Sequence, residues 1–153
     1  MQKLVELFSK YYGSEPSVVA PIKGSASNRR YFRLMNDEHS SVGVVGTDAD
    51  ENKAFVTLAK HFKSAGLPVP EVYAVSMDGM AYIQEDLGST TLYNMVSESS
   101  KSGSFADVED ILCRTVSYLP KFQFDGGRGA DWSVCYPEPS FSRRMVMFDL
   151  NYF

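Results

Sequence analysis

The sequence has few of the residues that bind metal ions or build disulfide frameworks. Its only cysteines are Cys113 and Cys135, which lie far apart, and its only histidines are His39 and His61. Because these residues lack the spacing of a metal-ligand motif, we do not expect a structural zinc site. Two thiols outside any disulfide pattern are typical of a protein in a reducing compartment.

Long apolar runs and clustered basic charge are also scarce. No apolar run approaches the length of a membrane-spanning helix, and residues 1–3 lead into an amphipathic pattern instead of a signal peptide. The sequence therefore predicts a cytoplasmic protein without a membrane partner. The formal net charge of -4 at pH 7 argues against a nucleic-acid partner, because such proteins need a clustered basic surface.

The first 88 residues have the pattern of an α+β domain. The chain has 153 residues, 44% of them hydrophobic, which is enough for a globular core. Apolar residues at helical spacing predict a helix from Leu4 to Tyr12, closed by Gly13. Strands are predicted over residues 17–23, 30–34, 41–45, 71–76 and 80–84. An apolar stripe over residues 55–65 predicts a helix after the third strand, giving a five-stranded antiparallel sheet with an inserted helix.

After residue 88 the strand signals stop and helical patterns follow. We predict a short helix near Leu92, a polar connection over residues 97–104, and a longer helix from Val108 to Leu119. A last amphipathic helix runs over residues 141–152, with Ser140 as its N-cap. Because this helix has no stop signal, we expect a truncated chain that lacks a C-terminal lobe. The alternatives are a terminal helix that docks on the core and a dimer formed through residues 141–153.

The segment Gly-Ser-Ala-Ser-Asn-Arg-Arg-Tyr-Phe, residues 24–32, has the features of an anion-binding loop. Its short side chains let backbone N–H groups approach a ligand closely. Arg29 and Arg30 add positive charge in the bidentate geometry that suits phosphate oxygens. The alternative is an ordinary polar hairpin whose arginines are solvated.

Four blocks, at residues 24–34, 51–55, 66–75 and 84–88, occur in an order that resembles a known family. The order of hairpin, third strand, helix, two strands, acidic connection and helices resembles the N-terminal lobe of the protein-kinase-like fold. More closely, it is similar to the aminoglycoside phosphotransferase family, in the branch of the cell-wall amino-sugar kinases. The resemblance implies a nucleotide-binding lobe over residues 1–88 and the helical start of a second lobe over residues 89–153.

The resemblance also implies roles for individual residues. The residues that would cover the nucleotide phosphates are Ser25, Ala26, Ser27, Asn28, Arg29 and Arg30. The residues that would form the hinge between the lobes are Gln84, Glu85, Asp86 and Leu87. Within the hinge, the main chain of Gln84 and of Asp86 would contact the adenine edge.

Further roles concern the adenine and the phosphate charge. Ile22 and Val44 would form an apolar roof over the base, although both could be ordinary core residues. Glu51 lies where kinases place the glutamate that orients a strand lysine. The third strand, residues 42–46, carries no lysine, so Arg29 or Arg30 would have to supply that charge. A carboxylate that stabilises a helix N-terminus is the simpler explanation of Glu51.

The catalytic motif of the family, His-x-Asp-x-x-x-x-Asn with a downstream aspartate for magnesium, does not occur in the sequence. We therefore predict that this chain alone does not catalyse phosphoryl transfer. The first hypothesis is the nucleotide-binding part of a small-molecule kinase that uses ATP or a similar NTP with Mg²⁺. Its other partner would be a sugar or amino-sugar hydroxyl, with the metal ligands outside this chain. The alternatives are a non-catalytic nucleotide-sensing or scaffold module and an α+β interaction domain.

Overall fold

Within residues 1–23, 28–103 and 105–151, which the computed structural model describes, five strands form one antiparallel sheet. The strands are β1 (Val18–Ile22), β2 (Arg30–Met35), β3 (Ser40–Val45), β4 (Val72–Val75) and β5 (Ala81–Glu85). Their order in the sheet is β1-β2-β3-β5-β4, and helix α2 (Ala49–Ser64) connects β3 to β4. The predicted α+β class, with five antiparallel strands and a helix inserted after the third, is confirmed.

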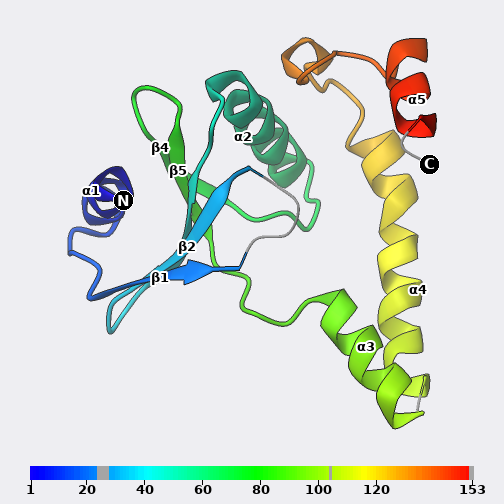
Figure 1. Cartoon of the computed structure of the whole chain (residues 1–153), viewed down its shortest axis with the longest axis horizontal. Coiled ribbons are helices and arrows are strands. Elements are labelled where there is room, and N and C mark those ends of the chain that lie inside the picture. The colour runs from blue at the N-terminus through cyan, green and yellow to red at the C-terminus, as the bar shows by residue number, and fades with distance from the viewer. Residues whose placement is uncertain (24–27, 104, 152–153) are drawn as a thin grey trace.

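Helix α1 (Gln2–Tyr12) covers one face of the sheet (Figure 1). Its buried residues Leu4 and Phe8 form a core with Leu34, Ala81 and Ile83. A Cβ atom on Gly43 would lie 2.6 Å from the Leu34 side chain and 2.9 Å from the Leu4 side chain. The absence of a side chain on β3 at this point therefore lets α1 pack closely on the sheet.

Helix α2 packs on the opposite face of the sheet. Because successive strand residues point to opposite faces, Tyr82 lies on the α2 side while its neighbours Ala81 and Ile83 lie on the α1 side. Tyr82 and Val44 pack there with Ala59 of the helix. The sheet is thus the middle of three layers, each of its faces covered by one helix (Figure 1).

Capping by Asp48 fixes the start of α2. Its side chain accepts hydrogen bonds from the backbone N–H groups of Asp50 and Glu51, at 2.8 and 3.2 Å. These bonds satisfy donors that have no partner within a helix, and the two acidic residues of the first turn suit the helix dipole. The first turn, which carries Glu51, is therefore well defined.

Most of the rest of the chain is helical, and its two longest helices lie away from the sheet (Figure 1). Its elements are α3 (Leu92–Ser102), α4 (Ala106–Pro120), the π-helical turn η1 (Lys121–Asp125), the 3₁₀ helix η2 (Trp132–Val134) and α5 (Arg143–Leu150). In the described parts of the chain, no helix has the length and apolar character needed to cross a membrane.

Two predictions for this helical part are wrong. The polar connection expected over residues 97–104 is helical as far as Ser102, because Met95 and Val96 are half-buried and Ser99 is buried. Helix α5 is capped by Ser142, whose hydroxyl accepts from the N–H of Met145, and not by Ser140.

Candidate functional site

The arginines of the predicted phosphate loop lie where the chain enters β2. Ser25, Ala26 and Ser27, which were predicted to contact phosphates, lie outside the described residues, while Asn28 and Arg30 are exposed. Arg29 is different, because its side chain is only 12% exposed. The structure therefore gives the two adjacent arginines distinct surroundings.

Arg29 is held against the first turn of α2. Its Nη2 atom lies 3.1 Å from the carboxylate Oε1 of Glu51 and donates a hydrogen bond of 3.1 Å to the backbone carbonyl of the same residue. The guanidinium carbon also lies 5.4 Å from the centre of the Phe55 ring, a cation–π contact. The structure thus brings together two residues that the sequence assigned to the site, Arg29 and Glu51, from different elements.

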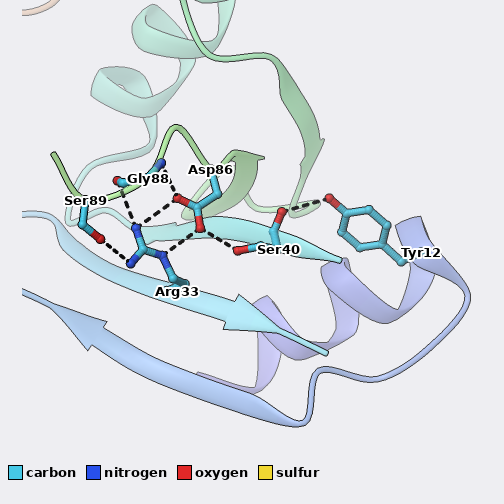
Figure 2. Close-up of polar contacts among 6 residues, drawn as sticks. All are labelled: Tyr12, Arg33, Ser40, Asp86, Gly88 and Ser89. Carbon is cyan, nitrogen blue, oxygen red and sulfur yellow. Dashed lines mark hydrogen bonds and ion pairs between the residues drawn. The ribbon is translucent and has the colours of Figure 1, made fainter. Parts of the chain in front are cut away.

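A second polar cluster joins β2 to the predicted hinge (Figure 2). The Arg33 guanidinium binds the Asp86 carboxylate in a bidentate manner, with Nε to Oδ2 at 2.7 Å and Nη2 to Oδ1 at 3.0 Å. It also donates to the Gly88 carbonyl at 3.0 Å and to the Ser89 hydroxyl at 2.8 Å. One side chain of β2 therefore holds the segment from Asp86 to Ser89.

Asp86 accepts two further hydrogen bonds, from the Ser40 hydroxyl at 2.5 Å and from the Gly88 N–H at 3.0 Å. Burial by itself would raise the pKa of the Asp86 carboxyl. The hydrogen bonds from Ser40, Arg33 and Gly88, with the positive charge of Arg33, outweigh burial and hold the pKa below its ordinary value. Asp86 therefore stays ionised at neutral pH and accepts all of these bonds.

The other residues of the predicted hinge differ in their exposure. Glu85 accepts from the Glu71 N–H and from Lys63 Nζ, both at 3.0 Å, and the first of these contacts contributes most to lowering its pKa. Gln84 is half-buried, and its Oε1 atom is buried with no hydrogen-bond partner among the described residues. Leu87 is 66% exposed.

The two residues predicted to roof the base differ in the same way. Ile22, at the end of β1, is half-buried and lies opposite Tyr31 in the sheet. Val44 is fully buried in the core beneath α2, where it packs with Tyr82 and Val72. Only Ile22 therefore offers surface to a ligand in this conformation.

Arg33 is the site residue that the sequence did not identify. Arg33 pairs with Ala20 of β1 on one side and with Val42 of β3 on the other, and its side chain lies on the sheet face that α2 covers. A basic residue at an inward strand position is unusual and indicates an acidic partner. Which acidic residue is the partner depends on the strand order. Asp86 is 53 residues away in the sequence.

Neither the comparison with protein-family models nor the search of curated proteins found a match. In the described parts of the chain, no group of three or more histidine, cysteine, aspartate or glutamate residues is placed to hold a metal ion. The sheet and the two clusters around Arg29 and Arg33 are therefore the features of the structure that bear on function.

Proposed function

We propose that this chain is the nucleotide-binding part of a small-molecule kinase with a protein-kinase-like N-terminal lobe. The observation that carries the proposal is the pairing of Arg29 with Glu51, shortly after the small-residue segment in the sequence. The pair fixes the position of the Arg29 guanidinium, whose charge Glu51 balances, and the exposed Arg30 next to it adds a positive charge at the same point of the chain. Arginines at such a loop suit the oxygens of a polyphosphate.

The position of the hinge cluster supports the same proposal. Side chains at alternate positions of a strand share a face, so Arg33 lies on the same sheet face as Tyr31, which packs under α2. Arg33 and Asp86 hold the start of the connection to α3 beside that face. Their two nitrogen–oxygen distances are 2.7 and 3.0 Å. A nucleotide would lie with its phosphates near Arg29 and Arg30 and its base near Gln84 and Asp86.

The reaction in which this part would take part is transfer of the γ-phosphoryl group from ATP or a similar NTP to a sugar or amino-sugar hydroxyl. The chain would bind and orient the nucleotide, and Mg²⁺ would neutralise charge on the phosphates. The base that accepts the hydroxyl proton and the metal ligands would lie outside this chain. Alone, the chain is expected to bind nucleotide but not to turn it over.

The test is a calorimetric titration of the 153-residue chain with magnesium-ATP. We expect a dissociation constant between about 1 µM and 1 mM. Arg30→Ala should weaken binding about tenfold, because a charge-assisted contact to phosphate is lost. The matched control is Arg114→Ala, which removes an exposed arginine on α4. Absence of binding by the wild-type chain, or equal weakening by the two variants, would refute the proposal.

A further inference from the structure

Residues 122–136, here called the strap, contact α2 at two places. At the C-terminal end of the helix, His61 Nε2 donates a hydrogen bond of 2.8 Å to the Gly126 carbonyl. The neighbouring rings of Phe62 and Phe122 meet edge to face, with centroids 5.5 Å apart and planes at 80°. Helix and strap are therefore joined here by one polar and one aromatic contact.

Gly126 makes this contact unusually close. The residue is buried, and a Cβ atom on it would lie 2.6 Å from the Leu67 side chain and 2.8 Å from the Phe122 carbonyl. A contact of that length to a backbone atom cannot be relieved by a side-chain rotation. The glycine-rich segment of residues 126–129 is thus packed against the end of α2 at its first residue.

The strap meets α2 again at the other end of the helix. The 3₁₀ helix η2 contacts α2, and Tyr136 follows shortly after η2. The Tyr136 hydroxyl interacts with the carboxylate of Asp48, the N-cap of α2, and this contact is the main reason that the pKa of Tyr136 is raised. Asp48 and His61 are 13 positions apart, or about 20 Å along a helix. The strap therefore holds both ends of α2.

The first turn of α2 is also where Glu51 binds Arg29. A helix moves as one rigid element, so a restraint at its C-terminal end also limits motion of its first turn. We propose that His61 is a positioning residue: by anchoring the strap to α2, it fixes Glu51 and, through Glu51, Arg29. The consequence for nucleotide binding rests on the function proposed above, whereas the mechanical coupling does not.

The coupling can be measured without any ligand, by hydrogen exchange on the full chain. In His61→Ala, the amides of residues 51–55 should exchange about fivefold faster, although they lie at the far end of the helix. His61→Gln should restore slow exchange, because its amide can donate to the Gly126 carbonyl. The matched control is His39→Ala, since His39 stacks on Tyr12 on the α1 side and should leave α2 unchanged.

Two outcomes would overturn the coupling. The first is faster exchange confined to the last turn of α2 and to residues 121–129. The second is equal acceleration at β3, which would mean that the variant is destabilised as a whole. If His61→Ala does not fold, Tyr136→Phe removes one hydroxyl at the opposite end of the strap. It should speed exchange at residues 51–55 about twofold, and unchanged exchange there would equally refute the coupling.

Magnesium-ATP titrations then separate the two proposals. If the wild-type chain binds, His61→Ala should weaken binding about threefold and His61→Gln should not, because the alanine variant loses the restraint on Arg29. Equal affinity of the alanine variant and the wild type would limit the role of the strap to stability. If the wild-type chain does not bind, the proposed function fails, while the exchange result still decides whether the strap positions α2.

Discussion

Replacing Arg33 with alanine should destabilise the protein more than removal of any ordinary surface ion pair. The change removes both hydrogen bonds to the Asp86 carboxylate and the bonds to Gly88 and Ser89. Asp86 would remain in its half-buried place with only the Ser40 hydroxyl and the Gly88 N–H as donors. An ionised carboxylate that has lost its counter-ion away from water is costly.

The magnitude follows from the exposure of the pair. The side chains of Arg33 and Asp86 are 23% and 10% exposed. Loss of one partner costs about 3–5 kcal/mol for a fully buried pair, whereas an exposed pair contributes less than about 1 kcal/mol. We expect an intermediate loss of about 2–3 kcal/mol in the free energy of unfolding. For a chain of this length, that corresponds to a fall in Tm of about 4–12 °C.

Urea denaturation followed by far-ultraviolet circular dichroism measures this loss. The neighbouring pair of Lys63 and Glu85 is the control, because its atoms are also close, at 3.0 Å, while its side chains are 40% and 34% exposed. Lys63→Ala should therefore cost less than about 1 kcal/mol. A loss for Arg33→Ala that is no larger than the loss for Lys63→Ala would refute the reasoning.

The pH dependence of the stability difference between the wild type and Arg33→Ala tests whether the loss arises from the Asp86 carboxylate. The folded-state pKa of Asp86 is lowered, so its stabilising contribution is present above the unfolded-state pKa of about 4. This contribution is lost as the pH falls through the lower, folded-state pKa. The stability difference between wild type and Arg33→Ala should therefore be constant near neutral pH and shrink below about pH 4. A difference that grows on acidification would point to another group.

Two further predictions concern two buried polar residues, Asn52 on α2 and Ser41 on β3. Gly46→Ala should cost about 2–4 kcal/mol in urea denaturation, because the new Cβ would lie 2.4 Å from Asn52 Nδ2, which donates to the Gly79 carbonyl at 2.9 Å. A cost below about 1 kcal/mol would mean that Asn52 readily finds another position. Ser41→Ala should be neutral or stabilise by up to about 1 kcal/mol, because the fully buried Ser41 hydroxyl has no hydrogen-bond partner among the described residues. A clear loss of stability in the same assay would contradict that reasoning.

The parts of the fold that could be predicted are those set by local sequence. Asp48 ahead of an apolar stripe gives the start of α2, Gly13 gives the end of α1, and the Asp-Gly pair at residue 78 gives the β4–β5 turn. Helix α3 extends further than predicted. The prediction ended it early because serine has low intrinsic helix propensity. Ser99 is nevertheless buried, and Ser100 donates back to the Val96 carbonyl. Packing of the helix decided its length.

The candidate site was predictable only in part, because its contacts depend on strand order. Alternation on β2 shows that Arg33 and Leu34 point to opposite faces, but it does not reveal what lies over each face. That Asp86 reaches Arg33 requires β5 to lie beside β3, with the chain leaving β5 next to Ser40. The crossover through α2 creates this neighbourhood, and no short sequence window contains it.

Under the function proposed above, Arg29 would supply the cation that β3 lacks. A lysine on β3 would have to occupy position 42 or 44, the positions that face α2. Both are valines, and Val44 is fully buried against Tyr82. This row of β3 is apolar, and the Arg29 guanidinium lies instead against the first turn of α2, just before the start of β2. There Arg29 binds Glu51 through Nη2 while its guanidinium lies over the Phe55 ring. The arrangement holds the Arg29 guanidinium, paired with Glu51, next to β2 without placing a lysine in the core, where an unpaired ammonium group would be costly.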